Sequence, residues 1–228
     1  CCRHGYCKLI KPVKLYLIRH APVKQIKGCF PKHNPDAIIK KNQIKMLATL
    51  IPNNCVWYVS PLKRAIQTAE ALSKFVTNSK IVIENKLIEQ NFGDWSGKKI
   101  SEVWEVLKKC KTKHNFSFIS PEYSPPNGES FKEQTKRVGV WLENLNFLED
   151  KSIVIISHAG TIRSILSHAL KIKHDYAIGI EILHQSLNIL EMINKNDDRH
   201  KGGRFRLLAL NIKPCLLYTS PSPRDPTK

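Results

Sequence analysis

Two short apolar runs, which lack the alternation of a half-exposed strand, constrain the fold of this chain most. Residues 15–18 (LYLI) and 153–156 (IVII) are apolar at every position. A strand with one face in water alternates apolar with polar side chains, whereas a strand covered by helices on both faces is apolar throughout. Helix-like patterns separate these runs from other apolar runs along the chain. The sequence therefore predicts an α/β fold on a mostly parallel sheet.

Breaker residues and helical periodicity give the expected order of elements. Strands are expected at 14–19, 55–59, 80–84, 152–157, 187–193 and 205–211, and helices at 36–50, 60–75, 100–107, 130–148 and 161–171. Asp36 and Ser60 have side chains suited to an N-cap, and Pro61 suits a first helical position. Ser130 is expected to begin the fourth helix. The proline-containing stretch 110–129 is expected to form a long loop, of the kind that often covers a site.

A length of 228 residues suits one large α/β domain, which we expect to span residues 14–211. Residues 1–13 show no periodicity and are left unassigned. The tail at 212–228 is rich in proline and polar residues and is expected to be disordered. Residues 215–225 also match one reading frame of a common transposon-adapter oligonucleotide. We therefore interpret the tail as non-native and exclude it from the fold.

The composition favours a soluble globular protein. Hydrophobic residues make up 42% of the chain and charged residues 25%, which is ordinary for a globular domain. No segment approaches the roughly 18 consecutive apolar residues of a membrane span. Lysines near the N-terminus also interrupt the apolar stretch that a secretory signal needs. We therefore expect a cytoplasmic protein with no membrane contact.

Seven cysteines and a net charge of +18 bear on cofactors and partners. An odd number of scattered cysteines indicates reduced thiols rather than disulfides. Cys1, Cys2, His4 and Cys7 match no standard zinc spacing, so no metal is expected. The positive charge suits nucleic acid, an anionic surface or an anionic substrate. Because the lysines are spread along the chain and no nucleic-acid motif occurs, nucleic acid is not the expected partner. No oligomeric state is predicted.

Both apolar runs end at a histidine. Arg19 and His20 follow the first run, and His158 follows the second. One such histidine is usually a packed or solvated side chain, but two in equivalent positions are informative. The carboxyl ends of parallel strands meet at one edge of a sheet, where open α/β folds gather their chemistry. The sequence therefore predicts that both histidines lie on this edge.

Two further residues lie where an anion site needs them. Arg64 falls in the first turn of the helix after strand 55–59, where a guanidinium and a helix N-terminus can share one anion. Glu89 lies in a stretch rich in glycine and aromatic residues, and apolar surroundings help a carboxyl group to keep a proton for general acid catalysis. The alternatives are a surface arginine and a solvated carboxylate in a turn packed by Trp95.

Five motifs occur in order along the chain: LIRHA, SPLKRAIQTAE, LIEQNFGDWSG, NGESF and VIISHAG. Any one of these motifs is weak evidence alone. The ordered set resembles the histidine phosphatase superfamily, also called phosphoglycerate mutase-like, over residues 14–211. Within the family the chain is most similar to α-ribazole phosphatases, through RHAPV, EQNFGDWSG and a helix containing RVxxWL. The resemblance implies a three-layer α/β/α sandwich on a mostly parallel sheet.

The resemblance also implies a metal-independent phosphatase that forms a phosphohistidine. His20 is the expected nucleophile, and Glu89 is expected to protonate the leaving group and then to activate water. Arg19, Arg64 and His158 are expected to hold the phosphate, because a phosphate monoester is a dianion that needs positive donors. The expected substrate is a small-molecule phosphomonoester, more narrowly α-ribazole 5′-phosphate from cobalamin biosynthesis. No cofactor is expected.

Two positions depart from the family pattern. Ala21 stands where the family usually has a glycine after the nucleophile, which rules out only a backbone conformation reserved for glycine. Phe30, Pro31 and Lys32 stand where relatives often have a Tyr-Gly pair, in the loop that is expected to select the substrate. Two alternative functions stay open: a phosphoglycerate mutase with the same first step, and a non-catalytic basic binding protein on the same scaffold.

Overall fold

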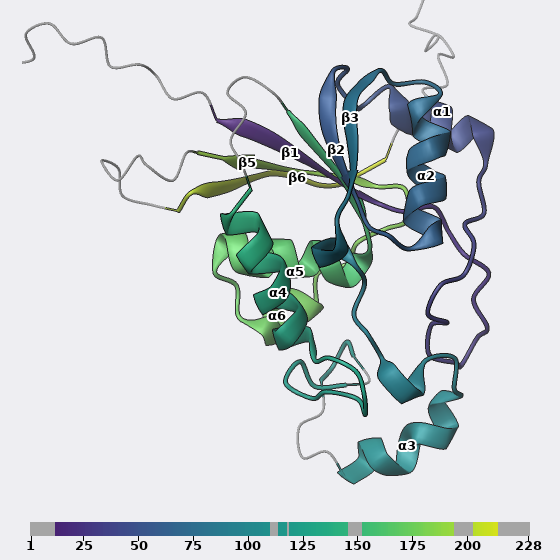
Figure 1. Ribbon diagram of the computed structural model, residues 1–228. Helices are drawn as coiled ribbons and strands as arrows, with labels where there is room; N and C mark the ends of the chain where they lie inside the picture. The colour runs from purple at the N-terminus through teal and green to yellow at the C-terminus, as the bar shows by residue number, and fades with distance from the viewer. Residues whose placement is uncertain (1–11, 110–113, 118, 146–151, 194–202, 214–228) are drawn as a thin grey trace, which may run out of the picture.

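Helices cover both faces of a six-stranded sheet in the computed structural model of the chain (Figure 1). The structure describes residues 12–109, 114–117, 119–145, 152–193 and 203–213. The predicted three-layer α/β/α sandwich is confirmed. The unassigned segment 1–13 and the tail 212–228 lie almost entirely outside the described residues. The described strands begin at Val13 and end at Ile212.

The sheet contains four parallel strands and an antiparallel edge of two. The strands are β1 (Val13–Arg19), β2 (Cys55–Val59), β3 (Asn78–Ile83), β4 (Ile153–Ser157), β5 (Leu187–Met192) and β6 (Phe205–Ile212), in the spatial order β3-β2-β4-β1-β5-β6. β3, β2, β4 and β1 are parallel neighbours. β5 pairs antiparallel with β1, and β6 pairs antiparallel with β5. The prediction of a mostly parallel sheet is therefore correct.

The helices form two layers and one outlying element (Figure 1). α1 (Lys41–Ala48) and α2 (Lys63–Ser73) cover one face of the sheet, and α4 (Phe131–Glu143), α5 (Ala159–Leu170) and α6 (His174–Ile178) lie on the other. α3 (Ile100–Lys109) lies apart from the sheet. Two single 3-10 turns, η1 (Asn85–Leu87) and η2 (Gly93–Trp95), connect β3 to α3. The sequence did not predict α6, because five residues carry little periodic signal.

The apolar run in β1 supplies both layers of the core. Leu15 and Leu17 belong to the cluster formed with α4 and α5, whereas Ile18 belongs to the cluster formed with α1 and α2. All three side chains are fully buried. Successive side chains of a strand point to opposite faces of the sheet. Because helices cover both faces, the run shows no polar alternation.

Two of the predicted N-caps are wrong. α1 begins five residues after Asp36, whose Oδ1 instead accepts a hydrogen bond of 2.9 Å from Gln67 Nε2. α2 begins after Leu62 rather than after Ser60, and the Ser60 hydroxyl lies 2.7 Å from His158 Nε2. A short polar side chain suits an N-cap and a tertiary hydrogen bond equally well. At Asp36 a tertiary partner takes the side chain. The Ser60 hydroxyl contacts His158 and also accepts from Leu62 N at 3.4 Å.

The predicted start of the fourth helix is correct. The Ser130 hydroxyl accepts from Glu133 N at 3.1 Å, and the Glu133 carboxylate accepts from Ser130 N at 2.7 Å. This capping box satisfies two backbone N–H groups at the start of α4. It also fixes the start of α4, the helix that carries Gln134 and Arg137.

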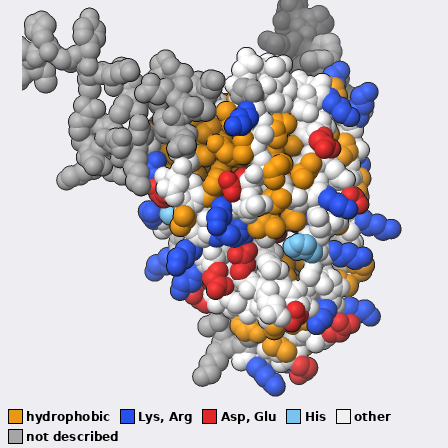
Figure 2. All heavy atoms as spheres, viewed as in Figure 1, with side chains coloured by type: hydrophobic (Ala, Val, Ile, Leu, Met, Phe, Trp, Pro, Cys, Tyr) orange, Lys and Arg blue, Asp and Glu red, His pale blue; other side chains and the backbone are white. Residues whose placement is uncertain are grey.

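Positive side chains are spread over the surface shown in Figure 2. Lys and Arg side chains lie along both flanks of this face, with apolar side chains between them. This distribution agrees with the interpretation that much of the net charge of +18 sits at solvated positions. Among the described residues, no helix is long and apolar enough to cross a membrane.

A small apolar cluster joins α3 to the loops that follow β1 and β3. It contains the buried side chains of Phe30, Trp95, Val103, Leu107 and Ile119. At its border, Gly93 has a φ of +51° and packs against the turn at 126–128. A Cβ atom on Gly93 would lie 2.0 Å from Pro126 O, which is backbone and cannot move aside freely. This contact sets the position of the loop that carries Glu89.

We predict that Gly93→Ala destabilises the fold far more than Gly28→Ala does. Both glycines have positive φ, but a Cβ atom on Gly28 would meet nothing within 4 Å. Gly28→Ala should cost about 1 kcal/mol from backbone strain alone, and Gly93→Ala should cost at least about 2 kcal/mol more because the backbones collide. Urea denaturation of both variants measures the difference. Equal losses would show that the two loops do not pack as described.

Candidate active site

The two histidines that end the apolar runs lie side by side at one edge of the sheet. β1 and β4 are paired with Arg19 opposite Ser157, so His20 and His158 follow neighbouring strand ends. His20 N donates to Ser157 O at 2.9 Å, and the two ring centroids are 4.9 Å apart. The predicted juxtaposition of these histidines is confirmed.

Hydrogen bonds fix the tautomer of His20. Its Nδ1 lies 2.6 Å from Ala21 O; because a carbonyl only accepts, Nδ1 carries the proton. Arg64 Nε then donates to the lone pair of His20 Nε2 at 3.2 Å. Ala21 N donates to Thr68 Oγ1 at 2.9 Å, and Ala21 is not among the residues with positive φ. Alanine therefore fits this position without strain.

Both imidazoles are electrically neutral near pH 7. Burial, aided by the neighbouring His158, lowers the pKa of His20 to about 2. Burial also holds the pKa of His158 well below its ordinary value, aided by the charges of Arg64 and Arg19. Desolvation disfavours the charged form of an imidazole. His20 therefore keeps an unprotonated Nε2 across the physiological pH range.

Two arginines frame His20 and are anchored to the backbone. Arg19 donates to Ile182 O and, through Nη2, to His184 Nε2 at 2.8 Å. Arg64 donates through Nη1 to His33 O at 3.1 Å. Burial lowers the pKa of Arg19 to about 10, which leaves it protonated at pH 7. The anchors therefore orient two full positive charges at the site.

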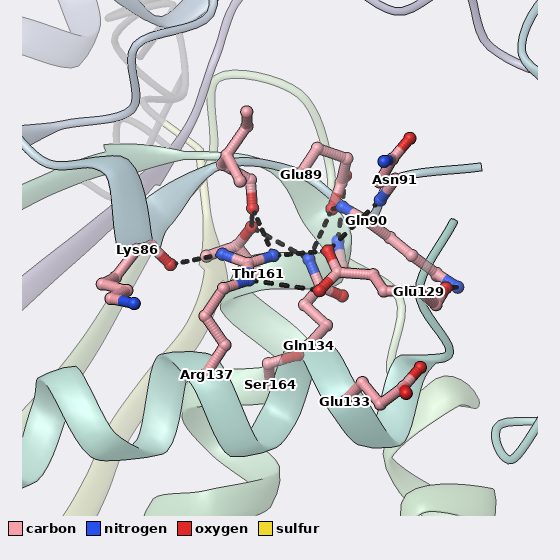
Figure 3. Close-up of polar contacts among 12 residues, drawn as sticks. Lys86, Glu89, Gln90, Asn91, Glu129, Glu133, Gln134, Arg137, Thr161 and Ser164 are labelled. Carbon is pink, nitrogen blue, oxygen red and sulfur yellow. Dashed lines mark hydrogen bonds and ion pairs between the residues drawn. The ribbon is translucent and has the colours of Figure 1, made fainter. Parts of the chain in front are cut away.

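Glu89 reaches the same edge from the loop after β3 (Figure 3). Its Oε1 accepts from Gln90 N at 3.0 Å and from Gln134 Nε2 at 3.1 Å, and its Oε2 accepts from Gly160 N at 3.2 Å. A Cβ atom on Gly160 would lie 2.4 Å from Glu89 Oε1, so a larger residue would displace the carboxylate from this position. Polar donors therefore hold Glu89, and not the aromatic surroundings that the sequence led us to expect.

The aromatic residues of that stretch pack against one another instead. Trp95 stacks on Tyr123 with ring centroids 5.5 Å apart. Phe30 contacts both Trp95, at 5.5 Å, and Phe92, at 5.6 Å. Of these rings, Phe30 and Phe92 also line the cavity that contains Glu89.

Arg137 of α4 holds the segment just before Glu89 (Figure 3). It donates to Lys86 O at 2.6 Å and to Ile88 O at 3.1 Å. Its guanidinium also forms a paired contact with the Glu129 carboxylate, with distances of 2.6 and 3.2 Å. Because both carbonyl anchors lie within three residues before the acid, α4 fixes where the Glu89 side chain begins.

An open cavity of about 950 Å³, counting the solvent at its mouth, joins these residues. Arg19, His20, Arg64 and Glu89 line it, and His158 is fully buried beside His20. The structure therefore brings all five predicted residues together. Apolar side chains also line the cavity, namely Val23, Ile26, Phe30 and Phe92.

Arg163 of α5 also lines this cavity. Its Nε donates to Ile180 O at 2.6 Å, while its two η nitrogens donate to none of the described residues. Burial lowers the pKa of this guanidinium, and the charges of Glu89 and Glu181 oppose that shift. The cavity thus holds a further positive donor that the sequence analysis did not single out.

His184 and Gln134 are further residues that the sequence analysis missed. His184 Nδ1 donates to His20 O at 3.1 Å, and its Nε2 accepts from Arg19. Burial lowers the pKa of His184 to about 4, so it acts as a neutral acceptor. It follows an irregular segment with no motif, whereas Gln134 lies in the apolar stripe of α4. Only Gln134 gave a signal in the sequence, because it is a polar residue at a position of the helix where apolar residues are expected.

A metal site was not predicted, and the N-terminal cysteines lie outside the described residues. Within the part of the chain that the structure describes, no group of three or more His, Cys, Asp or Glu side chains is arranged to hold a metal ion. The charges around His20 come from arginine.

Comparison with known proteins identifies the family. A model of the histidine phosphatase superfamily (branch 1) matches residues 15–211. Phosphoserine phosphatase 1 of Hydrogenobacter thermophilus is 30% identical over 166 residues, which cover 67% of this chain and 74% of the relative. The adenosylcobalamin/α-ribazole phosphatase of Salmonella typhimurium is 26% identical over 167 residues, which cover 69% of this chain and 80% of the relative.

A solved structure supports the same fold. The α-ribazole phosphatase of Shigella flexneri superposes with a TM-score of 0.68 at 21% identity, covering 88% of this chain and 96% of that chain. The predicted resemblance is thereby confirmed: the chain belongs to the histidine phosphatase superfamily and is a phosphatase of that superfamily.

Proposed function

We propose that this chain hydrolyses small phosphomonoesters through a phosphohistidine on His20, without a metal. Glu89 supplies and then removes a proton, and Arg19, Arg64 and His158 hold the phosphate. The proposal includes a cytoplasmic location, supported by the free thiols of Cys29 and Cys55.

Buried nitrogens without partners carry this proposal. Arg19 Nε and His158 Nδ1 are buried and bond to none of the described residues. Both belong to side chains beside His20, whose Nε2 already faces Arg64. Buried polar groups are nearly always paired, so unpaired ones need a functional explanation. A phosphate dianion on Nε2 would accept from both nitrogens.

The first step transfers the phosphoryl group to the protein. The lone pair on His20 Nε2 attacks phosphorus, and the bond from phosphorus to the ester oxygen breaks. Glu89 gives its proton to that oxygen, so the alcohol leaves uncharged. Arg64, which donates to Nε2 in the free site, turns its N–H groups to the phosphoryl oxygens. The tautomer set by Ala21 O keeps Nε2 nucleophilic.

The second step returns His20 to its starting state. Glu89 is now a carboxylate and takes a proton from water as the water oxygen attacks phosphorus. The bond from Nε2 to phosphorus breaks and inorganic phosphate leaves. The arginines stabilise the negative charge on the three non-bridging oxygens in both steps.

We predict that His20→Ala abolishes hydrolysis of p-nitrophenyl phosphate, because no other group can form the intermediate. In Glu89→Gln the p-nitrophenolate still leaves without a proton, but water is no longer activated. The phosphorylated form should therefore accumulate, and mass spectrometry should find one phosphoryl group on the peptide containing His20.

His33→Ala is the matched control: the exposed His33 side chain makes no hydrogen bond to a described residue, and the substitution keeps the backbone carbonyl that contacts Arg64. It should keep its activity. Retained turnover in His20→Ala, or a phosphoryl group on another residue, would contradict the proposed mechanism. Steep salt-dependent binding of DNA without any hydrolysis would instead support the binding-protein alternative.

The neutral state of buried His20 also predicts how stability depends on pH. The unfolded chain binds a proton on His20 below about pH 6.5, whereas the native pKa is lowered to about 2. The unfolded state thus binds more protons between these values, so stability falls as the pH decreases through 6.5. From pH 8 to pH 5 the loss due to His20 should be about 2 kcal/mol.

Urea titrations at both pH values test this prediction. His20→Gln should lose less stability on acidification than the wild type, by about 2 kcal/mol. His33→Gln, with an exposed side chain, should follow the wild type. A His20→Gln variant with the wild-type pH dependence would show that His20 is not held neutral by burial.

We further propose α-ribazole 5′-phosphate as the substrate. The apolar wall of the cavity, which includes Phe30 and Phe92, suits the flat apolar base of this molecule. Arg163 offers free N–H donors for the oxygens of a ribose. A relative of 26% identity is named an adenosylcobalamin/α-ribazole phosphatase, which agrees with this choice.

A panel of phosphomonoesters tests the substrate. We expect a higher kcat/KM for α-ribazole 5′-phosphate than for phosphoserine, phosphoglycerates or sugar phosphates. Phe92→Ala should lower that kcat/KM about tenfold, by removing apolar contact with the base, and should leave glycerol 2-phosphate almost unaffected. A preference for phosphoserine would contradict the choice of substrate. Phosphoryl transfer between phosphoglycerates would favour the mutase alternative.

A further inference from the structure

Gln134 is a fully buried side chain whose amide touches the proposed acid. It projects from α4 toward Glu89 and Thr161 (Figure 3). Its Nε2 donates to Glu89 Oε1 at 3.1 Å and to Thr161 Oγ1 at 3.3 Å. Its Oε1 is buried and accepts from none of the described residues. Such an arrangement stabilises the fold poorly, because one amide atom loses its water without gaining a partner.

Thr161 fixes which way this amide points. The Thr161 hydroxyl lies 3.1 Å from Ile88 O and 3.4 Å from Leu87 O, and carbonyls only accept. Its one hydrogen therefore goes to the backbone, and it offers only a lone pair to Gln134. A reversed amide would place Gln134 Oε1 against this lone pair and against Glu89 Oε1. Both contacts would join two acceptors, so the NH2 group stays toward Glu89.

The two oxygens of Glu89 consequently differ. Oε1 accepts two hydrogen bonds, from Gln90 N and Gln134 Nε2, whereas Oε2 accepts one, from Gly160 N. A proton on Oε1 would face the N–H groups of Gln90 and Gln134 that already donate to this oxygen, so two hydrogens would compete for one place. Oε2 has a lone pair to spare for a proton. The donors thus distinguish the oxygens before any substrate binds.

We propose that Gln134 is a positioning residue that reserves Oε1 of Glu89 as an acceptor, so that Oε2 alone carries the catalytic proton and hands it to the leaving oxygen. This inference rests on the proposed function, because it concerns the acid of that reaction. Gln134 is not among the residues that line the cavity. Its effect is confined to steps in which Glu89 transfers a proton.

Leaving groups of different basicity separate this role from a structural one. An alkoxide needs a proton to leave, whereas p-nitrophenolate does not. The ratio kcat/KM reports steps up to formation of the phosphohistidine, so later hydrolysis does not obscure it. In Gln134→Leu we expect kcat/KM for glycerol 2-phosphate to fall at least about tenfold. For p-nitrophenyl phosphate it should fall less than about threefold.

Thr135→Val is the matched control. Thr135 is the next buried polar residue on α4, and its hydroxyl bonds to Phe131 O at 2.9 Å and Ser164 Oγ at 3.3 Å rather than to Glu89. Its variant should change both esters by the same factor. Circular dichroism and thermal melting of each variant verify that the fold is kept.

Thr161→Val provides a second test where Gln134→Leu does not fold. It removes the group that pins the amide and leaves Gln134 in place, so the preference for p-nitrophenyl phosphate should rise by a smaller factor. Equal losses for both esters in the folded variant would overturn the inference while leaving the phosphatase mechanism intact. A wild-type chain that hydrolyses neither ester would overturn the proposed function and this inference with it.

Discussion

The site depends on keeping imidazoles uncharged among guanidinium groups. Arg19 and Arg64 are both held by backbone carbonyls, of Ile182 and His33. A backbone carbonyl orients a guanidinium group but leaves its positive charge intact. A paired carboxylate would neutralise that charge. The positive charge therefore remains available to an anion that enters the site. His20 stays neutral in turn, because a proton on it would add a charge to a buried cationic group.

The sheet supplies the geometry that this electrostatic arrangement needs. β2, β4 and β1 are adjacent parallel strands, and their carboxyl ends deliver Ser60, His158 and His20 in that order. Ser60 contacts His158 and His158 contacts His20. A slip of one residue in either pairing would turn these side chains to the opposite face. The same buried apolar runs that build the core thus also fix the register of the site.

Burial and hydrogen bonding explain which parts of the structure the sequence could predict. Strands apolar on both faces were located well, because burial leaves an unambiguous pattern. The caps at Asp36 and Ser60 were misassigned because their hydrogen-bonding capacity is used by distant residues that no local pattern reveals. His184 gave no signal, since an irregular segment brings it to Arg19. Gln134 did give one, as a polar residue between Phe131 and Val138 on an apolar stripe.

The cavity is built from two parts of the chain that different parts of the fold support. Arg19 and His20, which we propose to bind the phosphate, stand at a strand end, whereas Val23, Ile26 and Phe30 of the cavity lining belong to the loop after His20. That loop is tied to the α3 region by Phe30 N to Lys98 O and Ile100 N to Gly28 O, each 2.8 Å. Its apolar anchor is the separate cluster around Trp95. Changes in this outlying cluster can reshape that part of the cavity without disturbing the register of β1 and β4. The loop residues Phe30 to Lys32, where the chain departs from its family, lie in this independently supported part.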